Sequence, residues 1–211
     1  MRKFIFIIFL FLTLPFCTTT ADAQQYCIPG RFDTTYCFTS QQIEVVDNVI
    51  YGQNTNWQGS IVNLDYIIAY PNFKSDTLQK RPFILLIHGG GFIDGNKYQL
   101  APVMMDFALR GYVCASINYR IGWDLTGDPF ACNGTNTSLS KAVYRAMQDA
   151  NAAFRHFAAN CDKYNIDTNY FFAGGVSAGA VTSLLISYAT QENMNSLYPG
   201  FINELGPLNS V

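Results

Sequence analysis

The sequence predicts an α/β fold in which helices flank a mostly parallel sheet. Pro82–Ile87 is a continuous apolar run, the pattern of a strand that is buried on both faces. Val113–Asn118 is a second strand-like run, and the helical pattern of Leu100–Arg110 lies between the two. A longer helical pattern extends from Leu139 to Phe157. Strands that alternate with helices in this way indicate parallel β-α-β units.

Two further strand-like segments precede this alternation. Ile43–Ile50 and Ile61–Tyr70 are separated by Gly52–Asn56, a turn-rich stretch, and we expect them to form a hairpin at the start of the sheet. Pro71–Arg81 is a polar connection into the buried strand.

Local signals mark the two long helices. Pro102 is tolerated in the first turn of the first helix, and Gly111 stands just past its end. A loop with several glycines occupies residues 121–137, and Ser138 precedes the second helix. The apolar residues of that helix recur at spacings of three and four: Leu139, Ala142, Val143, Ala146, Met147, Ala150, Ala153, Phe154 and Phe157. This pattern predicts one long helix with a single apolar face.

A serine follows the apolar run Tyr170–Ala173 within the pentapeptide Gly175–Gly179, which reads G-V-S-A-G. The pattern G-x-S-x-G is typical of a strained turn between a strand and a helix that lifts the serine hydroxyl above the sheet edge. Glycines suit the flanking positions because side chains there would collide with the neighbouring strand and helix. The alternative interpretation of Ser177 is an ordinary helix N-cap.

A glycine triplet follows the buried strand, within His88–Phe92, which reads H-G-G-G-F. In acyl transfer, backbone N–H groups aimed at the developing oxyanion contribute about 3 kcal/mol per donor. Glycine lets the backbone approach a substrate closely, so this loop suits such donors. A dinucleotide loop is a poor fit, because a G-x-G-x-x-G pattern that starts at Gly89 would need glycine in place of Asp94.

With these motifs the chain resembles the serine esterases and lipases of the α/β-hydrolase fold, particularly the carboxylesterase and hormone-sensitive-lipase-like group. The matching segments are His88–Phe92, Asn118–Arg120 and Gly175–Gly179, and the resemblance covers about residues 61–188. It implies that Ser177 is the nucleophile, and that the N–H groups of Gly90, Gly91 and Ala178 form the oxyanion hole. It also implies a small-molecule or polysaccharide-linked ester as substrate, and no metal or organic cofactor.

The triad of that family is incomplete in this sequence. Its acid and histidine follow the serine in the chain, but the only two histidines, His88 and His156, precede Ser177. Glu192 and Glu204 are the acids after Ser177, and neither follows a strand-like run. We therefore interpret the chain as the N-terminal portion of a carboxylic-ester hydrolase whose later strands are missing. Without a base the serine is a weak nucleophile, so efficient turnover is not expected.

Two other functions stay open at this stage. A non-catalytic hydrolase-like binding protein would keep the glycine loop and lack triad residues, as this sequence does. A serine peptidase of the same fold would keep the chemistry and change the substrate.

The remaining candidate residues have structural alternatives. Phe92 and Trp123 either line an acyl or alcohol pocket or belong to ordinary packing. His88 is expected to hold the oxyanion loop through a hydrogen bond of its ring. His156 lies off the apolar stripe of its helix, and we expect it to face solvent or to flank the core.

The first residues predict export. Arg2 and Lys3 precede the apolar stretch Phe4–Phe16, and Ala21–Ala23 offers an A-x-A cleavage site, so residues 1–23 are interpreted as a signal peptide. The domain boundaries that follow are a cysteine-bearing extension at 24–42 and the partial hydrolase domain at 43–211. The expected location is secreted, periplasmic or at the cell surface.

Charge and hydropathy bear on partners. The formal net charge is −2 and no basic stripe occurs, which argues against a nucleic-acid partner. No second long apolar segment suggests an integral membrane segment after signal cleavage.

Cysteine use agrees with an oxidising compartment. We pair Cys27 with Cys37 and Cys132 with Cys161, while Cys114 lies in a strand-like run and is expected to be a buried thiol. The cysteine spacings fit no zinc pattern, so no metal site is expected.

Overall fold

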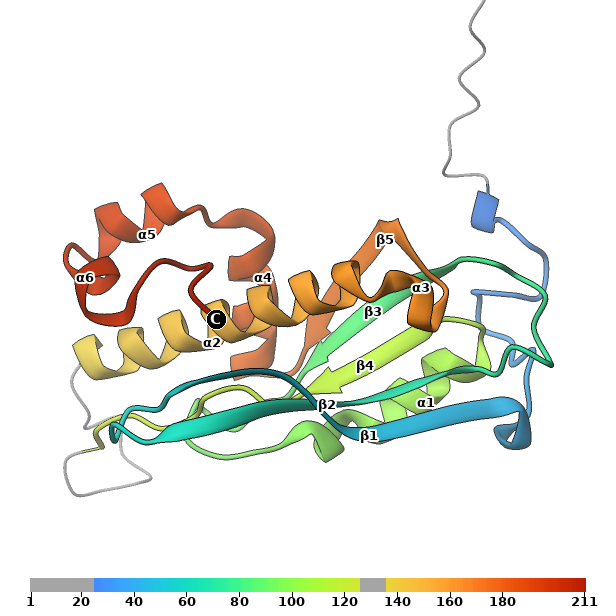
Figure 1. The fold of residues 1–211 in the computed structure, drawn as a ribbon, viewed down its shortest axis with the longest axis horizontal. Coiled ribbons are helices and arrows are strands. Elements are labelled where there is room, and N and C mark those ends of the chain that lie inside the picture. Colours follow the sequence, from blue (N-terminus) through green and yellow to red (C-terminus); the bar gives the residue numbers. More distant parts are fainter. Residues whose placement is uncertain (1–24, 126–135) are drawn as a thin grey trace, which may run out of the picture.

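The computed structural model describes residues 25–125 and 136–211. Its centre is a five-stranded sheet with the order β1-β2-β4-β3-β5 (Figure 1). The strands are β1 (Ile43–Thr55), β2 (Ile61–Pro71), β3 (Arg81–Ile87), β4 (Val113–Ile117) and β5 (Ile166–Gly175). β3 is parallel to both β4 and β5, whereas β2 is antiparallel to β1 and β4. The expected α/β class with flanking helices is confirmed, and the sheet is mixed because β2 runs antiparallel to its neighbours.

The helices follow the expected alternation. They are α1 (Ala101–Leu109), α2 (Asn136–Ala159), α3 (Cys161–Tyr164), α4 (Ala178–Tyr188), α5 (Gln191–Leu197) and α6 (Phe201–Leu205), with 3-10 turns η2 (Ser40–Gln42) and η3 (Lys97–Leu100). α2 contains the whole predicted stripe from Leu139 to Phe157. The strand predicted at Tyr170–Ala173 is longer and starts at Ile166.

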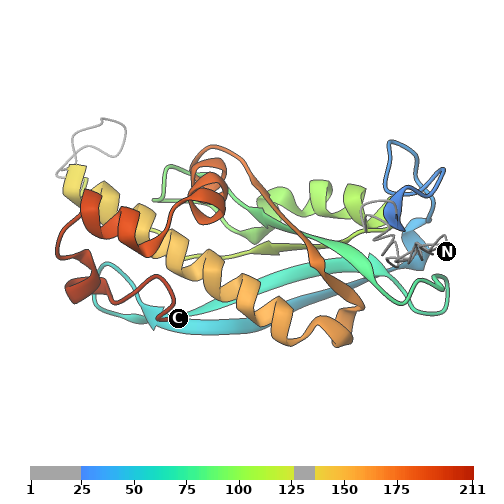
Figure 2. The same cartoon turned by 90° about the horizontal axis from the view of Figure 1, so that it is seen from above.

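Helices pack on both faces of the sheet (Figure 2). On one face, alanines of α2 and Phe157 pack against Phe83, Leu85 and Ile87 of β3. On the other face, Met104 and Ala108 of α1 lie in a second apolar cluster with residues of β2, β3 and β4. Side chains of a strand alternate between faces, so β3 contributes to both clusters and is buried throughout, as its continuous apolar run predicts.

The register aligns the carboxyl ends of three strands. Ile87, the last residue of β3, pairs with Ile117 of β4 and with Gly175 of β5. The residues that follow these three positions therefore leave the sheet at one edge. This is the edge at which parallel α/β sheets place their functional residues.

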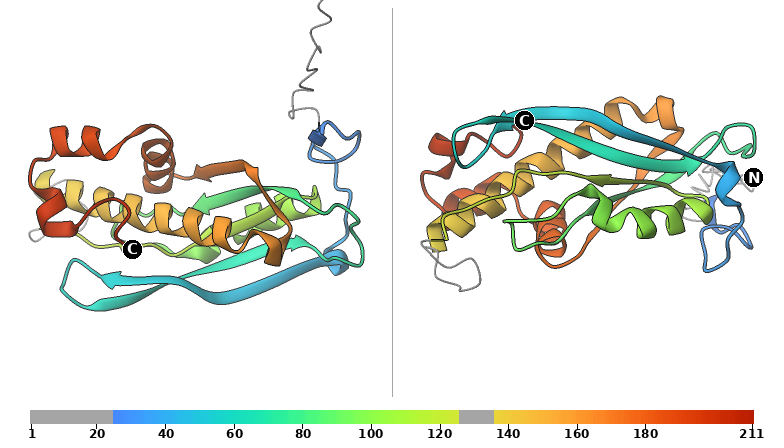
Figure 3. Two further views of the ribbon diagram at one scale, coloured as in Figure 1. Left: turned by 45° about the horizontal axis from the view of Figure 1, so that its top comes forward. Right: turned by 90° about the horizontal axis from the view of Figure 1, so that it is seen from below.

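The extension covering residues 25–42 lies at the opposite end of the sheet from the carboxyl terminus (Figure 3). Arg31 holds it in place with two hydrogen bonds to the buried carboxylate of Asp76, which also pairs with Arg81. The N–H of Cys37 donates to the Leu109 carbonyl oxygen at the end of α1 over 3.0 Å.

The predicted disulfide between Cys27 and Cys37 is wrong for this structure. The thiol of Cys37 instead donates to the Leu109 carbonyl oxygen over 3.6 Å, so the contact with α1 takes the place of the expected staple. Cys132 lies outside the described residues, so its predicted pairing with Cys161 does too. Cys161 itself forms no disulfide, and its thiol lies 3.8 Å from Asp162 Oδ1. Cys114 is a buried free thiol, as expected.

In the described part of the chain, β5 pairs only with β3, so its second edge carries no strand. Phe172 on β5 exposes 49% of its surface, and Leu184 and Tyr188 of α4 are exposed too.

None of the helices described is long and apolar enough to cross a membrane. The predicted signal peptide, residues 1–23, lies outside the described residues.

Candidate active site

Ser177 stands at the junction of β5 and α4, at the edge where three strands end. It is the N-cap residue of α4, its side chain is exposed, and its backbone has φ 53° and ψ −116°. Few non-glycine residues adopt this conformation, which costs about 1–3 kcal/mol. The surrounding packing must therefore hold Ser177 in place. This is the strained turn that the pentapeptide predicts.

The two glycines of the pentapeptide allow β3, β5 and α4 to approach one another. A Cβ atom on Gly179 would overlap the carbonyl oxygen of Ile87. One on Gly175 would stand 2.5 Å from the carbonyl carbon of Gly179 and 2.6 Å from the Ile87 oxygen. The reason given above for glycine at both positions is confirmed.

The glycine triplet lies directly beside Ser177. A Cβ atom on Gly89 would be 3.4 Å from Ser177 Cβ and 3.0 Å from the carbonyl oxygen of Val176. The chain then turns sharply, because the Gly90 carbonyl oxygen accepts from the N–H groups of Ile93 and Asp94, each over 3.0 Å. Gly90 has φ 106°, and a side chain there would overlap the Asp94 carbonyl oxygen.

Three backbone donors near this turn are not used by the protein. Within residues 25–125 and 136–211, no group accepts a hydrogen bond from the N–H of Gly90, Gly91 or Ala178. Ala178 is the first residue of α4, where N–H groups have no intrahelical acceptor and the helix dipole favours negative charge. These donors can bind an anionic oxygen.

His88 holds the loop, as expected. Its ring is buried, Nδ1 donates to the Gly89 carbonyl oxygen over 2.7 Å, and the ring stacks on Tyr119 with centroids 4.3 Å apart. Burial lowers the pKa of His88 below its ordinary value, which favours the neutral ring.

His156 flanks the core rather than facing solvent. It is half-buried on α2, and its Nε2 lies 3.2 Å from the hydroxyl of Tyr66. Burial lowers the pKa of this ring too. Neither histidine of the chain forms a hydrogen bond with Ser177.

Phe92 and Trp123 pack against the core next to the glycine loop. Phe92 is buried in the core beside Tyr119, so it belongs to the packing alternative. Trp123 packs partly against the same core, and its Nε1 donates to the Gly91 carbonyl oxygen over 3.0 Å. Both side chains therefore fix the backbone that carries the predicted oxyanion donors.

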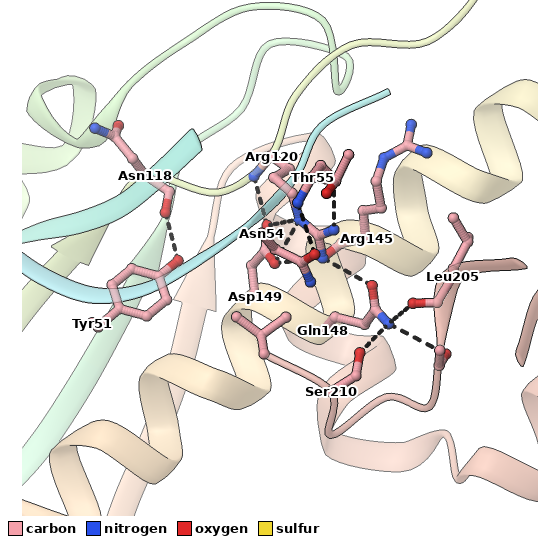
Figure 4. Close-up of polar contacts among 12 residues, drawn as sticks. Tyr51, Asn54, Thr55, Asn118, Arg120, Arg145, Gln148, Asp149, Leu205 and Ser210 are labelled. Atoms are coloured by element: carbon pink, nitrogen blue, oxygen red, sulfur yellow. Dashed lines mark hydrogen bonds and ion pairs between the residues drawn. The ribbon is translucent and has the colours of Figure 1, made fainter. Parts of the chain in front are cut away.

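The segment after β4 supplies a second layer that the sequence reasoning did not assign. The Tyr119 hydroxyl donates to the His88 carbonyl oxygen over 3.0 Å. Arg120 forms a buried ion pair with Asp149 of α2, with Nη2 and Oδ1 2.7 Å apart (Figure 4). Arg120 also donates to the carbonyl oxygen of Thr55, at the end of β1, over 3.0 Å. These contacts connect the segment after β4 to the start of the glycine loop, to α2 and to the β1–β2 hairpin.

A signal for this layer exists in the sequence. Arg145, Gln148 and Asp149 lie at positions i, i+3 and i+4 of α2, so they share one helix face. Their face is polar, yet all three residues are buried, because Asp149 pairs with Arg120, Arg145 contacts Gly122 and the C-terminal segment covers Gln148. The amide of Gln148 donates to the carbonyl oxygens of Leu205 and Pro207 over 2.8 and 3.0 Å (Figure 4).

The described residues contain no group of three histidine, cysteine, aspartate or glutamate side chains that could hold a metal ion.

The strand order, the strained serine turn and the adjacent glycine loop are typical of the α/β-hydrolase fold. Residues 67–205 match the family model described as BD-FAE, and the chain belongs to this family.

Solved structures similar to this chain are forms of esterase 2 from Thermogutta terrifontis. The apo form is 24% identical, with a TM-score of 0.50, and the match covers 71% of this chain and 47% of that chain. The form phosphorylated by paraoxon is 23% identical, with the same TM-score of 0.50, over 72% of this chain and 50% of that chain. The chain thus spans about half the length of these esterases. A comparison with curated proteins gave no match.

Proposed function

We propose that this chain carries the nucleophile and the oxyanion hole of a serine carboxylic-ester hydrolase. The observation that supports this best is the position of Ser177. It is exposed on a strained turn at the N-terminus of α4, with the glycine loop against its Cβ atom. The esterase-like family and the α/β-hydrolase fold agree with this chemistry.

In the proposed reaction the Ser177 hydroxyl attacks the ester carbonyl carbon while a base takes its proton. The N–H groups of Gly90, Gly91 and Ala178 donate to the oxyanion that forms on the former carbonyl oxygen. The intermediate then collapses, the alcohol leaves with a proton, and an acyl-serine remains. Water attacks this acyl-enzyme by the same route and releases the acid, which regenerates Ser177.

The base for these steps is not one of the two histidines of this chain. His88 donates to Gly89 from inside the fold and His156 contacts Tyr66. We propose that the acid and the histidine of the triad belong to a part of the protein beyond these 211 residues. The 211-residue chain alone is then expected to hydrolyse esters poorly.

The test uses protein expressed from the complete reading frame. The expected result is hydrolysis of short-chain aryl esters, with a loss of about a thousandfold or more in kcat for Ser177→Ala. Ser187→Ala in the same helix is the matched control and should keep full activity. Activity that survives Ser177→Ala would overturn the assignment of the nucleophile.

The absence of a histidine partner for Ser177 favours one competing function, a non-catalytic hydrolase-like binding protein. The same assay separates the two. A complete reading frame that yields no ester hydrolysis, with a folded protein and intact Ser177, supports the binding protein. Hydrolysis of peptide amides in preference to aryl esters would instead indicate a peptidase.

We also propose that the protein is exported. The basic start, the apolar stretch and the A-x-A site within residues 1–23 support cleavage after Ala23. N-terminal sequencing of the mature protein tests this, and a mature product that begins at Met1 would contradict it.

A further inference from the structure

A cavity of about 500 Å³ lies at the tip of the β1–β2 hairpin, beside the segment that follows β4. Asn54, Asn56 and Trp57 of the hairpin form one wall. Arg120 and two cationic residues of α2, Lys141 and Arg145, also line the cavity, together with Glu204 and Leu205 of α6. β1 ends toward the same sheet edge as β3 and β4, so the cavity lies toward the edge of the sheet that carries Ser177.

The three cationic side chains of this cavity differ in whether a carboxylate contacts them in the described structure. Arg120 is paired with Asp149, and Lys141 forms an ion pair with Glu204. Arg145 exposes only 5% of its surface and has no carboxylate partner among the described residues. Its side chain turns away from Asp149 (Figure 4).

The guanidinium of Arg145 is also short of hydrogen-bond acceptors. Nη2 donates to the Gly122 carbonyl oxygen over 2.9 Å, but the buried Nε has no acceptor in the described structure. Burial and the neighbouring Arg120 lower the pKa of Arg145 to about 10, although the charge of Asp149 acts in the opposite direction. A buried cation that contacts no carboxylate and has an unpaired N–H is costly, and an anionic group in the cavity would lower that cost.

The opposite wall presents an aromatic surface. Trp57 exposes 44% of its surface, and its indole lies against Gly122, where any side chain would overlap the ring. An exposed indole beside amide side chains suits the apolar face of a sugar ring, whose hydroxyl groups can bond to Asn54 and Asn56.

Gly122 connects the cavity with the glycine loop. Its carbonyl oxygen accepts from Arg145, and its N–H donates to the carbonyl oxygen of Phe92 over 2.6 Å. Phe92 directly follows Gly91, one of the proposed oxyanion donors. Arg145 is therefore connected to the glycine loop through the two hydrogen bonds of Gly122.

We propose that this cavity binds the carboxylate of a sugar acid, with Arg145 as counterion and Trp57 as the surface for the ring. Its role as a substrate subsite rests on the proposed ester hydrolase. The substrate would then be an ester on an acidic saccharide, and Arg145 would determine specificity for it.

Equilibrium binding tests the site independently of catalysis. Titration calorimetry with glucuronate, glucose and acetate should show binding of glucuronate, with glucose and acetate at least about tenfold weaker. Equal binding of glucose and glucuronate would overturn the role of Arg145. Equal binding of acetate and glucuronate would overturn the role of Trp57.

Variants locate the site. Arg145→Met should weaken glucuronate binding at least about tenfold, whereas Arg155→Met, which removes an exposed cation of the same helix, should leave it unchanged. Trp57→Ala alters an exposed hairpin side chain and should also weaken glucuronate binding. It tests the position of the site even if Arg145→Met fails to fold. Unchanged binding in either cavity variant would overturn the proposal. Because the titration works equally on Ser177→Ala protein, its failure would leave the proposed esterase untouched.

Discussion

Gly89 lies in contact with Ser177: a methyl group on Gly89 would stand 3.4 Å from Ser177 Cβ and 3.0 Å from the carbonyl oxygen of Val176. The glycine loop therefore fits against the serine turn with no room to spare. This contact fixes the distance between the proposed nucleophile and the proposed oxyanion donors, so it offers a direct way to disturb catalysis without touching either.

Gly89→Ala should lower kcat/KM about a hundredfold with little effect on stability. The backbone must move by a few tenths of an ångström to accept the methyl group, and small misplacements of catalytic groups have effects of this size. Gly174→Ala is the matched control, because its methyl group would meet only Leu86 Cδ2 at 3.7 Å. Steady-state kinetics of both variants in the complete protein would check this. Equal activity in the two variants would contradict a close fit.

Ser177→Gly should stabilise the fold by about 1 kcal/mol while it abolishes activity. Glycine adopts φ 53°, ψ −116° with little strain, whereas serine does not. The control Ser187→Gly, in the same helix α4, should instead destabilise by about 0.5–1 kcal/mol. Denaturant titrations would measure both. A Ser177→Gly variant less stable than wild type would show that the turn stores no strain.

Stability should fall as the pH drops below about 6.5. Burial lowers the pKa of both His88 and His156 in the folded protein, so the unfolded chain binds more protons in that window. The loss begins at the ordinary histidine pKa and continues down to the lowered folded values. His156→Gln keeps a partner for the Tyr66 hydroxyl and removes one of the two groups.

The measurement is the free energy of unfolding of wild type and His156→Gln at pH 7.5 and pH 5. The variant should lose less stability between the two pH values. An equal loss would mean that His156 titrates normally in the folded state.

Asp149→Asn should destabilise the protein by about 3–5 kcal/mol, because it leaves the buried Arg120 without a counterion. Asp106→Asn removes the partner of Arg110 in an i,i+4 pair on the surface of α1, and should cost far less because solvent screens that pair. Thermal unfolding of the two variants would compare them. Similar losses of stability in the two variants would mean that the buried Arg120–Asp149 pair contributes no more to stability than a surface pair.

The sequence was sufficient to predict those elements whose residues repeat a simple pattern. The buried run Phe83–Ile87 and the stripe of α2 are period-based signals, and both form as predicted. The Gly175–Gly179 turn was predictable because steric overlap leaves glycine as the one residue that fits.

Other features depend on contacts between distant segments. Gln148 is buried by the C-terminal segment and Asp149 by Arg120, and helix periodicity carries no information about either contact. Predicted export suggested a disulfide for Cys37, but its position is set by hydrogen bonds to Leu109. Phe92 follows the glycines as a pocket residue could, and only the packing around Tyr119 places it in the core.

The central claim is that Ser177 is the nucleophile. The most direct test is mass spectrometry of the complete protein after treatment with a fluorophosphonate, which labels activated serines. We expect one phosphonyl adduct, on the peptide that contains Ser177, and none in Ser177→Ala. An esterase-active protein that carries its adduct on another residue would contradict the assignment of Ser177 as the nucleophile.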